Sequence, residues 1–178
     1  MKEEKTKNNR LNNILKDLNG SDEKKITTAI KQLRKHGNAK AIEPLIDRYM
    51  SSDNDIVKED ITSLLFDLKD ESAVPELINV MSKAKFEKIK PFIISILWQA
   101  AIDSSNHIST LVKEAIMGDY MTCIEVLTVI ESYDSSFNEE EIEDLKFDLD
   151  EAIEEADIEK QKLLITIKSV LEGLNIEY

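Results

Sequence analysis

The stretch SDNDIVKEDITSLLFDLKDESAVPELINVM, residues 52–81, decides the fold of this chain. Its apolar residues recur every three or four positions in two blocks, a spacing that places side chains on one face of an α-helix. The blocks predict helices over residues 56–68 and 73–83, separated by a short polar break. Because each helix is apolar on one face only, we expect the two to pack together as an antiparallel pair.

The same two-helix pattern recurs along the chain. Leucines hold matching places in alternate helices at separations of 30–34 residues; they are Leu45, Leu77, Leu111 and Leu145 in one set, and Leu33, Leu65, Leu97 and Leu127 in the other. A unit of about 32 residues with two antiparallel helices is typical of an α-solenoid, in which each unit buries its apolar face by stacking on its neighbours. We therefore predict an all-α fold, an α-solenoid of about four helix pairs plus terminal helices.

The pattern also gives approximate bounds and boundaries. The expected pairs are 21–36 with 41–49, 56–68 with 73–83, 86–101 with 108–117, and 120–132 with 139–156. A short helix over 9–18 precedes them, and a helix over 158–174 follows without a partner. Ser21 is the expected N-cap of the first pair, and Gly37 is expected to end its first helix in a left-handed conformation. Residues 1–8 are expected to form a polar flexible leader, residues 9–178 a single solenoid domain, and residues 133–138 a polar loop.

Composition agrees with a single helical domain. The chain has 178 residues but only 4 Gly and 3 Pro, too few turn residues for an all-β fold of this size. One Cys and two His leave no intramolecular disulfide and no standard structural zinc site. No secretory signal follows Met1, and the longest apolar run, residues 92–98, is too short to cross a bilayer. If Met1 is the native start, we expect a soluble, cytoplasmic protein.

Residues 52–81 also resemble the short HEAT repeats found in many bacterial proteins. In those repeats an acidic turn precedes a helix with Val and then a basic residue, and Asp comes before Ala-Val-Pro-x-Leu. In this chain the matching residues are Asp53, Asp55, Val57, Lys58, Asp70 and Ala73–Leu77. The first unit matches more loosely, and the third and fourth keep only the helical spacing. The resemblance implies a curved right-handed superhelix whose second helices line the concave side, and a role as a protein-binding scaffold.

The sequence offers no catalytic constellation. Cys123 falls in the apolar stripe of its helix, so we expect a buried thiol rather than a nucleophile. His36 is expected to cap a helix end, and His107 to be packed or hydrogen-bonded at a helix start. No catalytic base is evident, so we expect no enzyme activity, no cofactor and no metal. Some HEAT-like DNA glycosylases use an Asp in a basic, aromatic-lined cleft, and that context is missing here.

Charge is distributed unevenly between the two ends. Residues 1–40 carry a net charge of +6, whereas residues 91–178 carry −15. The basic leader could contact phosphates, but Glu3 and Glu4 interrupt it, so nucleic-acid binding is a minor alternative. Residues 139–157 hold eleven carboxylates against Lys146 alone, yet they keep an apolar stripe and predict an amphipathic helix. Its acidic face is either merely solvated, a surface for a basic protein, or an imitation of nucleic-acid phosphates.

One column of the repeat contains an anomaly. The residue two places after each leucine of the first set should point away from the core, and that column reads Asp47, Asn79, Lys113 and Phe147. One turn further on, the same face carries Met117 and Glu151. We hypothesise that Phe147 and Met117 are exposed and anchor a partner inside a rim of Lys113, Asp148 and Glu151. The alternative is that Phe137, or Ile176 and Tyr178, folds back to cover Phe147.

These observations predict a non-enzymatic protein-interaction module or scaffold. It is expected to be monomeric, to avoid membranes, and to bind another protein, of basic character if the acidic helix takes part, through its concave and acidic carboxyl-terminal surfaces. Two alternatives stay open: an acidic inhibitor or immunity-type protein that imitates nucleic acid, and a HEAT-like DNA glycosylase or other nucleic-acid enzyme.

Overall fold

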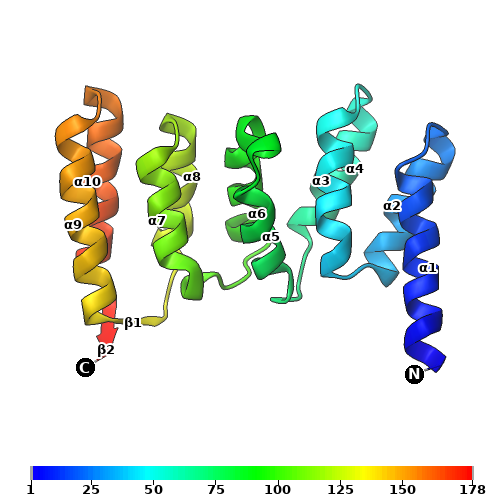
Figure 1. Ribbon diagram of the computed structural model, residues 1–178, viewed down its shortest axis with the longest axis horizontal. Coiled ribbons are helices and arrows are strands. Elements are labelled where there is room, and N and C mark those ends of the chain that lie inside the picture. Colours follow the sequence, from blue (N-terminus) through cyan, green and yellow to red (C-terminus); the bar gives the residue numbers. More distant parts are fainter. Residues whose placement is uncertain (1, 178) are drawn as a thin grey trace. The chain divides into compact units, whose positions relative to one another are not determined.

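The computed structural model describes residues 2–177, which divide between Val80 and Met81 into two compact units (Figure 1). The described chain forms ten α-helices, and its two strands have three residues each. The all-α prediction is therefore confirmed. The sequence suggested one domain over 9–178. The division falls at the end of the short helix α5, which is followed by a 3-10 helix, η2, and not by another α-helix.

The first unit packs its helices in two layers. Its elements are α1 (Lys2–Leu18), α2 (Glu23–His36), the 3-10 helix η1 (Ala39–Ala41), α3 (Ile42–Ser51), α4 (Asp55–Phe66) and α5 (Ala73–Met81), whose last residue belongs to the second unit. Helix α1 packs against α2 and α3, and α4 packs against α2 and α3. Their apolar faces meet in a core that includes Leu18, Ile26, Ile46, Ile61 and Leu65, all fully buried.

Helix α1 is longer than the sequence suggested. It begins at Lys2, so residues 2–8, expected as a flexible leader, are helical. Lys and Glu are good helix formers and no Gly or Pro occurs before Gly20, so nothing in the leader stops the helix. The helix packs through Leu11, Ile14 and Leu18, which recur at helical spacing and are buried.

The ends of α2 differ in detail from the expectation. Asp22, not Ser21, caps the helix, and its carboxylate accepts the backbone N–H groups of Lys24 at 3.0 Å and Lys25 at 3.3 Å. Gly37 follows with a φ of −70°, so the left-handed conformation expected for it is wrong. A Cβ at this position would lie 2.6 Å from the carbonyl oxygen of Leu33, so a close backbone approach requires the glycine.

The second unit contains the remaining elements. They are η2 (Ala84–Ile89), α6 (Lys90–Gln99), η3 (Ser105–His107), α7 (Ile108–Met117), α8 (Tyr120–Glu131), β1 (Ser136–Asn138), α9 (Glu139–Glu155), α10 (Ile158–Glu172) and β2 (Asn175–Glu177). Pro91 lies in the first turn of α6, where its missing N–H removes no helical hydrogen bond. Helices α6, α8 and α10 form one layer of this unit, and α7 lies beside α9 in the other.

The pairing of helices differs from the sequence interpretation. Helix α7 pairs with α8 and α9 pairs with α10, and in the first unit α1 pairs with α2 and α3 with α4. All four expected pairs are therefore wrong as the main pairings: 21–36 with 41–49, 56–68 with 73–83, 86–101 with 108–117, and 120–132 with 139–156. Helix α10 has partners too, because it packs on both α8 and α9. The physical reason is the length of the turns. Turns of only two residues, 118–119 and 156–157, place consecutive helices side by side and antiparallel.

Seven of the eight leucines in the two columns are buried, as the repeat pattern predicts. Leu127 is the exception, since it is only half-buried while Val126 and Val129 in the same helix are fully buried. Val129 lies 32 residues after Leu97, so a constant period would have selected it. At this helix the matching residue is a valine.

A pair of short strands replaces part of the predicted loop 133–138. Strand β1 pairs in parallel with β2, with Phe137 opposite Ile176. Parallel strands need a long crossover connection, and here the α9–α10 hairpin supplies it. Phe137 is buried and its ring lies 5.8 Å from that of Tyr133. A strand of three residues carries too little alternation to be recognised in the sequence.

Candidate protein-binding groove

An open groove lies between α7 and α9 within the second unit. Its wider part has a volume of about 790 Å³ and lies toward the carboxyl ends of the two helices. A smaller hollow continues toward their amino ends, and Lys113 and Asp148 line both parts. We call the two parts together the α7–α9 groove. Five of the predicted contact residues line it: Lys113, Met117, Phe147, Asp148 and Glu151.

The two predicted anchors are exposed at this groove. Met117 is 72% exposed and Phe147 is 63% exposed. Each follows a buried residue of its helix, Ala115 or Leu145, by two positions, which turns its side chain away from the core. Phe147 thus stays accessible because the packing of α9 uses Ile142, Leu145 and Leu149.

The segments that could have covered Phe147 lie elsewhere or outside the description. Phe137 is buried on β1, and Ile176 pairs with it on β2. Tyr178 lies outside the described residues. The alternative that Phe137 or Ile176 shelters Phe147 therefore does not hold.

The two remaining predicted residues belong to the first unit. Asp47 lies half-buried on α3 and Asn79 lies exposed on α5, where its amide donates to Glu76 at 3.4 Å. The structure therefore brings together five of the seven predicted contact residues. The leucine column places residues on equivalent faces of successive helices, but it does not require those helices to lie in one unit.

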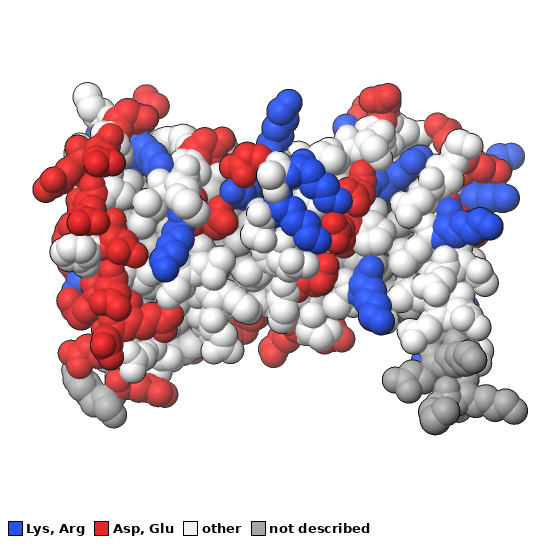
Figure 2. Space-filling model, viewed as in Figure 1, with Lys and Arg blue, Asp and Glu red and all other residues white. Residues whose placement is uncertain are grey.

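Acidic side chains gather along α9 (Figure 2), and those on its two sides differ in their partners. Away from the groove, Glu143 pairs with Lys146 at 2.7 Å and Asp150 pairs with Lys168 of α10 at 2.6 Å. The hydrogen bond that Lys146 donates to Glu143 raises the pKa of Lys146. On the groove side, four carboxylates make no ion pair within residues 2–177: Asp148, Glu151, Glu154 and Glu155. This side of α9 therefore presents carboxylates that no other described residue holds in an ion pair.

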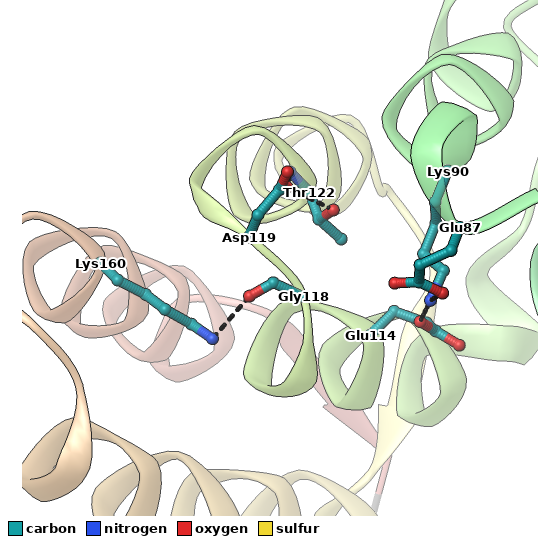
Figure 3. Close-up of polar contacts among 7 residues, drawn as sticks. All are labelled: Glu87, Lys90, Glu114, Gly118, Asp119, Thr122 and Lys160. Carbon is teal, nitrogen blue, oxygen red and sulfur yellow. Dashed lines mark hydrogen bonds and ion pairs between the residues drawn. The ribbon is translucent and has the colours of Figure 1, made fainter.

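Polar contacts fix both ends of the groove. At the amino end, the Ser109 hydroxyl of α7 donates to Glu141 of α9. At the carboxyl end, Lys160 Nζ of α10 donates to the carbonyl oxygen of Gly118 at 2.7 Å (Figure 3) and to that of Ile116 at 2.6 Å. The lysine satisfies carbonyl groups that the end of α7 leaves without helical partners. Helix α7 is therefore held to both α9 and α10 around the groove.

Sequence reasoning missed Lys160. The available signal was its position in the first turn of α10, where a cation opposes the helix dipole and needs a local partner. Its partners are backbone carbonyls of a helix more than forty residues earlier, and no side-chain pattern marks them.

A buried ion pair anchors α7 behind the groove, and the sequence interpretation missed it as well. Lys90 Nζ lies 2.7 Å from Glu114 Oε2 and 2.8 Å from Glu87 Oε2, and the side chains of Lys90 and Glu114 are each only 9% exposed (Figure 3). Burial lowers the pKa of Lys90, but hydrogen bonds and charge from Glu114 and Glu87 outweigh it, so the pKa is raised. Glu114 lies next to Ala115 on the buried face of α7, a position where a carboxylate signals a buried partner.

The one thiol and the two imidazoles lie in the core or at helix ends. Cys123 is fully buried as predicted, its Sγ lies 3.1 Å from the carbonyl oxygen of Ala115, and burial raises its pKa. A thiol with a raised pKa stays protonated and is a poor nucleophile. His36 is exposed in the last turn of α2, and His107 is half-buried just before α7.

Three further findings concern metal binding, membrane spans and likeness to known proteins. Within the part that the structure describes, no group of three or more His, Cys, Asp or Glu side chains is placed to hold a metal ion. No described helix is both long enough and apolar enough to span a bilayer. No known family model, curated protein or solved structure matches the chain.

Proposed function

We propose that the chain is a non-enzymatic protein-interaction module of the HEAT-like α-solenoid type. Support for the solenoid comes from within each unit, where antiparallel helix pairs pack side by side in two layers. Support from the sequence is the 32-residue period and the resemblance of residues 52–81 to short HEAT repeats. Such folds offer extended surfaces to partners, and binding through these surfaces requires no catalytic residues.

We propose the α7–α9 groove as the partner-binding surface. The observation that carries this proposal is the exposure of Phe147 and Met117 on its two walls. Large apolar side chains inside a charged rim have the anatomy of a binding hot spot, in which aromatic anchors supply most of the affinity. Uncompensated carboxylates beside them favour a partner with a basic surface.

Site-specific photo-crosslinking in cells of the source organism tests this proposal. A photoreactive amino acid replaces Phe147 in one variant and Ile165 in the control, since Ile165 is 50% exposed on α10 and does not line the groove. We expect one protein to crosslink from position 147 and not from position 165. The purified pair should then bind, and Phe147→Ala should weaken the complex by more than about 1 kcal/mol.

Two results would contradict the proposal. One is crosslinking that is equal at both positions, and the other is a purified complex that Phe147→Ala leaves unchanged. A captured nuclease or DNA-binding protein that loses its nucleic acid on binding would favour the inhibitor alternative, in which the carboxylates of α9 imitate phosphates.

A further inference from the structure

We infer that the α7–α9 groove takes a cationic amphipathic helix of the partner protein. This inference rests on the proposed function and names the chemistry of the occupant. It uses three properties of the groove: its charge, the position of its two apolar anchors and its helical walls.

Charge gives the first argument. Seven carboxylates line the groove, against Lys113 and Lys160; they are Glu140, Glu141, Asp144, Asp148, Glu151, Glu154 and Glu155. Lys160 donates to two backbone carbonyls and forms no ion pair with these carboxylates, so seven negative charges face only two positive charges in the groove. An occupant therefore needs several Lys or Arg side chains to complement the groove.

The anchors give the second argument. Leu111 and Leu145 hold equivalent places on α7 and α9, so Phe147 lies beside Lys113, and Met117 lies one turn further along on the opposite wall. With an interaxial distance of about 9 Å and an offset of one turn, about 5.4 Å, we expect the backbone positions of the two anchors to lie about 10.5 Å apart. Two residues about seven positions apart on one helix are separated by a similar distance, about 10.5 Å.

The walls give the third argument. Both walls are α-helices that run in the same direction, from the β1 end of the unit to the two short turns (Figure 1). The open space between two parallel helices is a trough into which the side-chain ridge of a third helix can fit. A helix with basic residues along its flanks and apolar residues about seven positions apart satisfies all three properties.

Peptide binding to the purified full chain tests the inference. The probe is a synthetic helical peptide of about five turns with lysines on one face and two leucines about seven positions apart on the other. One control peptide has the same composition in scrambled order, and a second carries a central proline that breaks the helix. Fluorescence anisotropy measures the dissociation constants, and circular dichroism verifies that each protein variant is folded.

We expect the helical peptide to bind at least about tenfold more tightly than either control peptide. Phe147→Ala and Met117→Ala should each weaken it by about fivefold or more, whereas Ile165→Ala should leave it unchanged. Equal binding of the scrambled or proline peptide would overturn the inference, because charge alone would then explain the affinity. Unchanged binding by Phe147→Ala would also overturn it. If the peptide fails while position 147 still crosslinks one protein, the proposed function stands and the helical occupant is wrong.

Discussion

Glu114 places a carboxylate where the pattern of α7 otherwise has apolar side chains. Its neighbours Val112 and Ala115 are fully buried, and Lys90, which Glu87 also contacts, is the one cation paired with it among residues 2–177. A buried charge is tolerated when it is paired, and removal of one partner leaves the other uncompensated. The pair therefore connects α7 to the start of α6.

Glu114→Gln should destabilise the protein by about 1–3 kcal/mol, because Lys90 then keeps only its exposed partner. Glu87→Gln is the matched control, since Glu87 is 63% exposed and an exposed partner contributes at most about 1 kcal/mol. Urea denaturation gives both values. Equal midpoint shifts for the two variants would show that the buried partner Glu114 adds no more to the free energy of unfolding than the exposed partner Glu87 does.

The raised pKa of Lys90 also fixes the sign of a pH dependence. A group whose pKa is higher in the folded state stabilises the fold at pH values below its unfolded pKa, and this contribution is lost as pH rises through the folded pKa. Between neutral pH and strongly alkaline pH, the wild type should therefore lose more stability than Lys90→Met does. Parallel loss in both proteins, measured by denaturation at each pH, would contradict this assignment.

At the scale of elements, the core of the first unit gives a direct test of the leucine columns. Leu65 on α4 and Leu77 on α5 are fully buried, so Leu→Ala at either should cost about 2–5 kcal/mol. Ile56→Ala is a control on the same helix as Leu65, because Ile56 is 66% exposed and should change stability by less than about 1 kcal/mol. An unchanged denaturation midpoint for Leu77→Ala would remove the basis of the columns.

The sequence predicted helices and their buried faces well, because both depend on side chains within one element. The exposure of Phe147 followed from its place two residues after Leu145, without knowledge of its neighbours. The partner of each helix did not follow, since periodicity identifies a face but not what covers it. Lys160 donates hydrogen bonds to backbone carbonyls, and β1 forms only by pairing with the distant strand β2. Neither feature therefore has a local sequence pattern by which it could be recognised.

At the scale of the molecule, charge should control how fast a basic partner arrives. Raising the salt concentration from about 0.01 M to about 0.15 M shortens the screening length from about 30 Å to about 8 Å. The association rate of the helical peptide should therefore fall, with a smaller change in its dissociation rate. Stopped-flow fluorescence measures both rates.

The salt dependence should come mainly from the groove side of α9. Asp148→Asn with Glu151→Gln should reduce the salt dependence, whereas Glu143→Gln with Asp150→Asn removes charges that already have lysine partners and should reduce it less. Equal effects of the two double variants would show that the total charge of the molecule, rather than the groove, attracts the partner.

The β1–β2 pair turns the last two helices into a closed loop. Phe137 and Ile176 pair with each other although they are 39 positions apart in the sequence. The whole α9–α10 hairpin lies between them along the chain. Closing a loop of this length costs chain entropy unless the folded hairpin already holds its ends together, so we expect the strands to pair after the hairpin has formed. The same geometry makes the strand amides reporters: any opening of α9 from α10 separates β1 from β2 and exposes their backbone hydrogens to exchange with solvent.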